Sequence, residues 1–69
     1  MAPIVVHPPS TTAGGRRVTV RGESLGLAHS DHDLVVFLMG AGLPDAEEVL
    51  DNPTWVEWRG GQAHEYTGP

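Results

Sequence analysis

The densest set of side chains that could do chemistry lies in one short stretch, HSDHD, at residues 29–33. Imidazole and carboxylate groups are ligands of zinc and of other divalent metals. We therefore consider a metal site built from His29, Asp31 and His32. Consecutive residues at the start of a helix fan outward, so such a site would need His64 or a neighbouring subunit as a further ligand. The competing interpretation, which we favour, is a helix cap with solvated first-turn side chains, and it predicts no metal or other cofactor.

The same stretch contains the residue types of a hydrolase triad, in His29, Ser30 and Asp31. Adjacent residues cannot converge on one another as a nucleophile, a base and an orienting group must. Ser30 is also expected to be occupied in capping the helix. We therefore predict no catalytic residues and do not expect an enzyme.

A second candidate surface lies near the C-terminus, where WVEWRGGQAHEY has the pattern of a hairpin around a double-glycine turn. In that register Trp55 pairs with Tyr66, and Glu57 pairs with His64. Trp and Tyr are frequent binding anchors, and Arg can stack or pair with an anion. The alternative is a set of cross-strand pairs that only stabilise an exposed sheet. The predicted ligand face consists of Trp55, Arg59, His64 and Tyr66.

The first of these clusters is positioned by the main predicted helix, at residues 30–41. Ser30 is a favourable N-cap, and Asp33 follows three residues later in a pattern close to a capping box. Gly42 fits the left-handed position that ends a helix, and Leu43 can contact the last turn. Both ends of this helix are therefore predicted from local signals.

This helix is apolar on more than one side. At about 100° per residue, one stripe is expected to face the sheet and consists of Leu34, Phe37, Leu38 and Ala41. The nearly opposite side is apolar too, whereas an amphipathic surface helix is polar there. Either a second, shorter helix in PDAEEVLDN covers that side, or a second copy or another protein does, because monomers seldom expose large apolar patches. The predicted partner interface consists of Val36, Met39 and Leu43.

The segment RRVTVRGESLGLA, at residues 16–28, alternates as a hairpin does, with Arg21 and Gly22 as its turn. The predicted register pairs Val18 with Leu25. Together with the C-terminal hairpin, this gives the order ββααββ. The predicted fold class is α+β, with a small antiparallel sheet of about four strands and two helices packed on one face.

A single domain is expected at residues 16–66. Residues 1–15 are rich in Pro, Thr and Gly and are predicted to be a flexible tail, in which residues 4–6 could add a short edge strand. Residues 67–69 are predicted to be a C-terminal tail.

Composition narrows the classes of function. The chain has 69 residues, nine acidic residues, four arginines, no lysine and no cysteine, and its formal net charge is −5. Such an acidic chain is not suited to nucleic acid. The absence of cysteine excludes zinc–thiolate sites and is consistent with a reducing cytosol. We see no signal peptide, and the longest apolar run is far short of the ~20 residues of a membrane span. We therefore expect a cytoplasmic protein with no membrane contact.

The pattern GRRVTVRGESLGLAHSDHDLVVFLMGAGL, followed by WVEWRGG and HEY, resembles short proteins of actinomycetes from Gly15 to about Tyr66. No activity is assigned to that group, so the resemblance implies a bacterial, cytosolic origin and transfers no functional residues. The sequence predicts a small acidic protein-interaction or regulatory module, with a homodimer as one form of it. The alternative function is a small divalent-metal-dependent protein that uses His29, Asp31 and His32.

Overall fold

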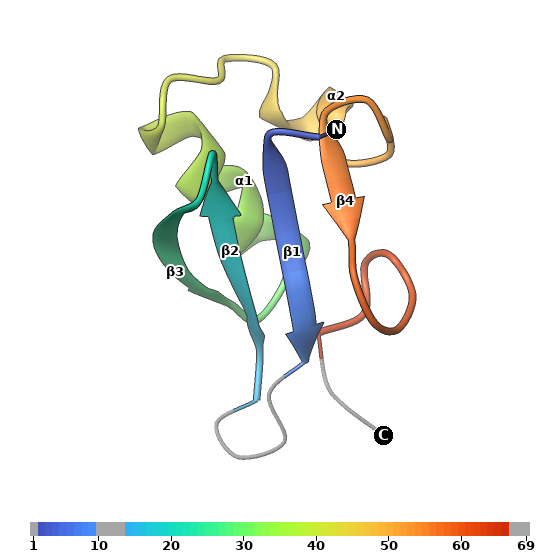
Figure 1. Cartoon of the computed structure of the whole chain (residues 1–69). Coiled ribbons are helices and arrows are strands. Elements are labelled where there is room, and N and C mark those ends of the chain that lie inside the picture. Colours follow the sequence, from blue (N-terminus) through green and yellow to red (C-terminus); the bar gives the residue numbers. More distant parts are fainter. Residues whose placement is uncertain (1, 10–13, 67–69) are drawn as a thin grey trace.

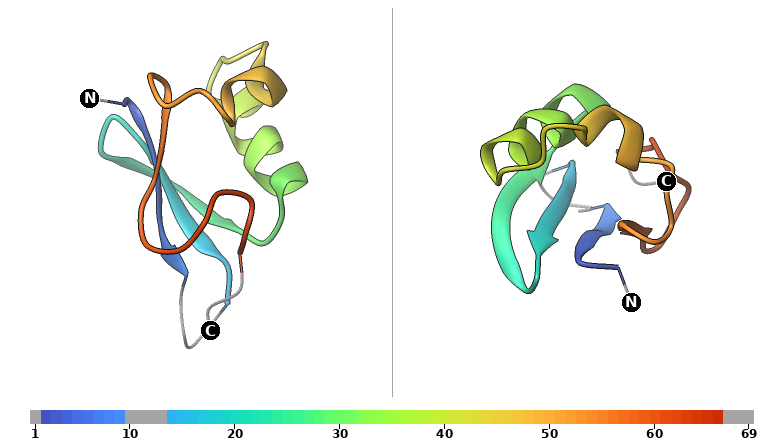
Figure 2. Two further views of the ribbon diagram at one scale, coloured as in Figure 1. Left: turned by 90° about the vertical axis from the view of Figure 1, so that its right-hand side faces the viewer. Right: turned by 90° about the horizontal axis from the view of Figure 1, so that it is seen from above.

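The computed structural model describes residues 2–9 and 14–66. The elements follow in the order β1 (Ile4–Pro9), β2 (Arg16–Val20), β3 (Glu23–Ala28), α1 (Asp31–Gly40), α2 (Ala46–Val49) and β4 (Val56–Trp58). The strands form one sheet in the order β3-β2-β1-β4 (Figure 1). Both helices lie on one side of this sheet, as Figure 2 shows. The predicted α+β class, with four strands and two helices, is confirmed.

The main departure from the expected order is β1. It forms from residues that the sequence places in a flexible tail, and it is an inner strand rather than an edge. Ile4 and Val6 alternate into the core and are almost completely buried, which favours a strand over a tail. The tail prediction is therefore wrong for residues 4–9. Residues 1 and 10–13, and the expected C-terminal tail at residues 67–69, lie outside the described residues.

The sheet is mixed rather than antiparallel throughout. β1 runs antiparallel to β2 but parallel to β4, and the chain has the order βββααβ instead of ββααββ. Parallel neighbours need a long crossover connection, and here the crossover contains β2, β3 and both helices. The predicted all-antiparallel topology is wrong because β4 pairs in parallel with β1, the N-terminal strand.

The first predicted hairpin is present as β2 and β3. Arg21 and Gly22 have φ values of 53° and 84°, as a type I′ turn requires. A β-bulge then shifts the register, so that Val18 pairs with Gly26 rather than with Leu25. The hairpin is confirmed, and the pairing predicted for Val18 is wrong.

The bulge brings a glycine directly under α1. Gly26 has a φ of 145°, and a Cβ atom there would lie 3.2 Å from Cζ of the Phe37 ring. Leu34 and Leu38 of the same helix are fully buried. Ala41, also predicted to face the sheet, is exposed. The Phe37 ring of α1 therefore lies over a position on β3 that has no side chain.

Both predicted caps of α1 are present. The Ser30 hydroxyl accepts a hydrogen bond from the N–H of Asp33 at 3.3 Å, and the Asp33 carboxylate accepts one from the N–H of His29 at 3.1 Å. At the other end, the N–H of Leu43 donates to the carbonyl of Leu38 at 3.0 Å across a glycine with positive φ. This is the Schellman pattern that the sequence predicts.

The core fills the space between the sheet and the helices. α2 is shorter than the predicted second helix, and it contributes Ala46, with Leu50 just beyond its end. Within the described residues, neither helix has the length and apolar character needed to cross a bilayer. The buried apolar cluster consists of Ile4, Val6, Val18, Ala28, Leu34, Leu38, Ala46, Leu50, Val56 and Tyr66.

Candidate functional site

The C-terminal segment does not form the predicted second hairpin. Gly60 and Gly61 both have positive φ, as the predicted turn requires. Nevertheless, residues 62–66 do not return as a strand, and β4 pairs with β1. Residues 59–66 instead curl into a loop beside the sheet (Figure 1). The residues predicted to share one ligand face are therefore redistributed.

The loop is organised by a buried cation, Arg16. Its side chain is completely buried, and the ring of Trp58 lies 5.4 Å from the guanidinium carbon. Burying a cation is costly unless acceptors surround it, and here the loop backbone supplies them. Nε donates to the carbonyl of His7 at 2.8 Å. The terminal nitrogens donate to carbonyls of Arg59 at 2.5 Å, Gly60 at 2.9 Å, Gln62 at 3.0 Å and Glu65 at 2.9 Å.

Sequence reasoning missed Arg16. The signal that could have revealed it is the period of two in β2, because Arg16 shares a face with Val18. Val18 is fully buried, and Arg16 points inward with it. A strand that carries an inward arginine needs a set of oxygen acceptors nearby, and this requirement explains why the chain beyond β4 turns back as a loop.

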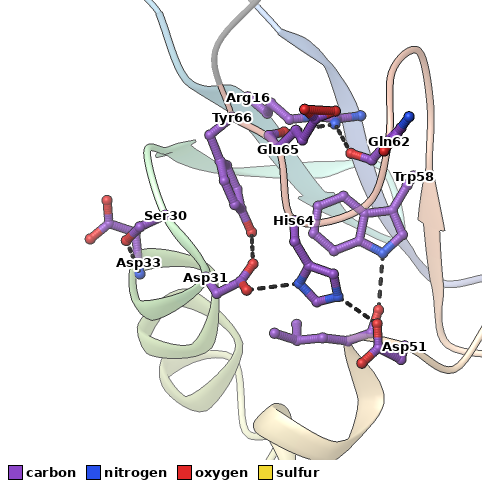
Figure 3. A network of polar contacts seen from close by, with 11 residues as sticks. Arg16, Ser30, Asp31, Asp33, Asp51, Trp58, Gln62, His64, Glu65 and Tyr66 are labelled. Atoms are coloured by element: carbon purple, nitrogen blue, oxygen red, sulfur yellow. Dashed lines mark hydrogen bonds and ion pairs between the residues drawn. The ribbon is translucent and has the colours of Figure 1, made fainter.

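A cluster of polar side chains fastens this loop to the helical layer (Figure 3). Nδ1 of His64 lies 2.7 Å from Oδ2 of Asp31, and Nε2 lies 2.5 Å from Oδ1 of Asp51. The hydroxyl of Tyr66 donates to Oδ1 of Asp31 at 2.6 Å. Asp31 is the first residue of α1, and Asp51 follows α2. The cluster therefore joins three segments that are far apart in the sequence.

The electrostatics of this cluster favour a charged imidazole. Hydrogen bonds to Asp51 and Asp31 raise the pKa of His64 above its usual value of 6.5. Burial, together with the hydrogen bond to Asp31, raises the pKa of the Tyr66 hydroxyl. Both ring nitrogens of His64 face carboxylates on opposite sides, so neither is free to accept a proton from a substrate or to bind a metal. The cluster acts as a structural clasp.

The structure separates the three residues of the metal hypothesis. The oxygens of Asp31 contact Tyr66 and His64. The ring of His29 lies against Gly15, where an added Cβ would approach Cε1 to 2.8 Å, and His32 is exposed. Within residues 2–9 and 14–66, no group of three or more His, Cys, Asp or Glu side chains is arranged to hold a metal ion.

The predicted ligand face is also not assembled. Tyr66 meets Trp58, with ring centroids 5.9 Å apart and planes at 76°, and it does not pair with Trp55. Arg59 forms an exposed ion pair with Glu57 on β4. The predicted Trp55–Tyr66 and Glu57–His64 pairs are wrong because β4 pairs with β1 and residues 62–66 do not form a strand beside it.

The predicted partner interface divides into two parts. Val36 and Met39 are 51% and 58% exposed, and α2 does not cover them. Leu43 instead packs against the core. A depression of about 330 Å³ lies between Met39 and α2. It is lined by four apolar residues and three acidic ones: Val35, Met39, Pro44, Ala46, Asp45, Glu47 and Glu48.

A larger groove of about 480 Å³ lies just beyond the C-terminal end of α1. It opens between the β2–β3 turn and the segment that precedes β4. Trp55, which is 41% exposed, forms one wall, and Leu43 lies opposite the sheet residues. The groove is thus lined both by Leu43, from the predicted partner interface, and by Trp55, from the predicted ligand face. Its lining consists of Pro3, Ile4, Val20, Arg21, Glu23, Leu25, Ala41, Gly42, Leu43 and Trp55.

No family model, curated protein or solved structure matches this chain. The function must therefore be inferred from the surfaces of the protein. The polar clasp is occupied by its own hydrogen bonds, whereas the acidic depression beside Met39 and the groove beside Trp55 are open.

Proposed function

We propose that the protein is a small protein-interaction module that binds a basic, amphipathic segment of a partner protein. The binding surface is the α1–α2 face, which comprises Val35, Val36, Met39, Pro44 and Ala46 with their acidic neighbours Asp45, Glu47 and Glu48. The observation that supports this proposal most is the depression beside Met39, where an apolar floor has an acidic rim.

The apolar part of the face supplies an anchor point. Met39 and Val36 expose more than half of their surface, and covering them removes apolar area from water at about 25 cal/mol per Å². A methionine side chain adapts its shape to different apolar partners. An apolar side chain of the partner can therefore enter the depression and pack against Met39.

The charged part of the face selects the partner. Within the described residues, Asp45, Glu47 and Glu48 form no ion pair. Two copies meeting through this face would bring their acidic rims together, and like charges across an interface oppose association. A partner segment with Lys or Arg beside its apolar anchors is complementary to the rim. Charge therefore favours a basic partner over a second copy.

The test is a titration of ¹⁵N-labelled protein with two helical peptides that share the same leucine spacing. One carries Lys at its polar positions, and the other carries Glu. We expect the Lys peptide alone to shift the amide signals of Val36, Met39 and Ala46, and its affinity to fall as salt is added. Met39→Glu should abolish these shifts. Leu27→Glu, on the exposed strand β3, changes a similarly accessible residue and should leave them intact.

Two results would overturn the proposal. The first is that neither peptide shifts the signals of the α1–α2 face. The second is that light scattering of the protein alone shows a dimer that Met39→Glu dissociates, because the face would then be covered by a second copy.

A further inference from the structure

The groove beside Trp55 differs in character from the α1–α2 face. Its floor consists of sheet residues, including Ile4 from β1 and Val20 from β2, and its walls are formed by Leu43 and Trp55. Its volume of about 480 Å³ lies within the range of small-molecule sites. The groove is open and mostly apolar, and it shares no lining residue with the depression beside Met39.

The indole of Trp55 is free to contact a ligand. Nε1 of the other tryptophan, Trp58, donates to the carbonyl of Leu50 at 2.9 Å. For Trp55 no such partner exists among residues 2–9 and 14–66, and the side chain is 41% exposed. A tryptophan that is partly uncovered beside an apolar groove is a typical anchor for an apolar or aromatic group.

The groove is lined by two residues of opposite charge. Arg21 and Glu23 both line the groove, and neither is in an ion pair within the described part of the chain. Arg21 also has a φ of 53° at a turn position where Asn and Gly are favoured. Arg21 therefore lines the groove from a turn position whose backbone conformation disfavours arginine.

From this combination we infer that the groove binds a free α-amino acid with an apolar or aromatic side chain. The side chain packs between Leu43 and Trp55, the carboxylate meets the guanidinium of Arg21, and the ammonium meets the carboxylate of Glu23. A simple carboxylic acid would leave Glu23 facing a like charge, and a simple amine would do the same for Arg21. A zwitterion satisfies both charges.

The first test is an NMR titration with L-phenylalanine that monitors the Trp55 indole and the amides of Val20, Leu25 and Leu43. We expect saturable shifts confined to the groove. Three control compounds each lack one recognised group: 3-phenylpropionate, phenethylamine and glycine. Each should bind at least about tenfold more weakly. Absence of saturable shifts with L-phenylalanine would overturn the inference, as would equal binding by any of the three controls.

The second test separates binding from folding. Arg21→Asn places a favoured residue in the turn, so the variant should unfold at a higher temperature than the wild type while binding L-phenylalanine at least about tenfold more weakly. Arg17→Gln, an exposed arginine on β2, is the matched control and should bind as the wild type does. Unchanged binding by Arg21→Asn would show that the guanidinium does not recognise the ligand.

Discussion

Nδ1 of His64 lies 2.7 Å from Oδ2 of Asp31, and this contact fastens the C-terminal loop to the first residue of α1. The other ring nitrogen meets Asp51. A charged imidazolium can donate to both carboxylates, whereas a neutral imidazole can donate to only one. Attachment of the loop is therefore coupled to the protonation of one side chain.

This coupling predicts how stability depends on pH. The pKa of His64 is raised in the folded state, so its contribution is complete below the unfolded value of 6.5 and is lost as pH rises through the raised pKa. We expect the free energy of unfolding, measured with urea, to fall as pH increases from 6.5. His64→Gln should remove this decrease.

A second histidine provides the control for this prediction. The pKa of His7 is lowered, chiefly by burial, so its contribution is present above 6.5 and is lost as pH falls through the lowered pKa. His7→Gln should therefore leave the decrease above pH 6.5 in place. A wild-type protein that becomes more stable over that range would contradict the role assigned to His64.

Arg16 is predicted to be the polar side chain on which the fold depends most. Arg16→Met removes the donors to the loop carbonyls and leaves these acceptors without their partner. Each hydrogen bond to a charged group contributes about 1.5–3 kcal/mol, so we expect a loss of at least about 3 kcal/mol in urea unfolding. The exposed Arg17→Met should change stability by about 0.5 kcal/mol or less. Equal effects of the two substitutions would contradict the organising role of Arg16.

The contact between Gly26 and Phe37 can be tested with a pair of glycine substitutions. Gly26→Ala places a Cβ 3.2 Å from the ring at a φ of 145°, and we expect it to cost about 1–3 kcal/mol. At Gly40, on α1, an added Cβ would meet nothing within 4 Å beyond its own helix, so Gly40→Ala should raise stability by about 0.5–1 kcal/mol. Thermal unfolding of both variants checks the prediction, and a shift in the same direction for both would refute it.

The elements that sequence reasoning predicted correctly are those with local causes. The cap at Ser30 and the stop before Leu43 depend on hydrogen bonds within one or two turns of helix. The turn at Arg21 and Gly22 joins strands that are adjacent in the chain. The residues that make up each of these signals lie within a few positions of one another. They can therefore be recognised in a single sequence.

The elements that sequence reasoning missed depend on contacts between residues that are far apart in the chain. The parallel pairing of Ile4 with Val56 joins two ends of the chain, and no local pattern specifies it. The double glycine indicated a turn. The backbone carbonyls beyond it accept hydrogen bonds from Arg16 instead of pairing with a neighbouring strand. His64 likewise meets Asp31 instead of Glu57 because the loop is curled. The sequence singled out Asp31, His64 and Tyr66, but it indicated neither their contacts with one another nor the part played by Asp51.

The central functional claim is that acidic residues on the α1–α2 face select a basic partner, and a charge exchange tests it most directly. In the double variant Glu47→Lys/Glu48→Lys the rim changes sign at two exposed positions. The control Glu23→Lys/Glu57→Lys has the same net charge but leaves the face unaltered. The measurement is the affinity of each protein for the Lys and Glu peptides by titration calorimetry. We predict that the wild type and the control prefer the Lys peptide and that the double variant prefers the Glu peptide. The same preference in all three proteins would contradict the claim.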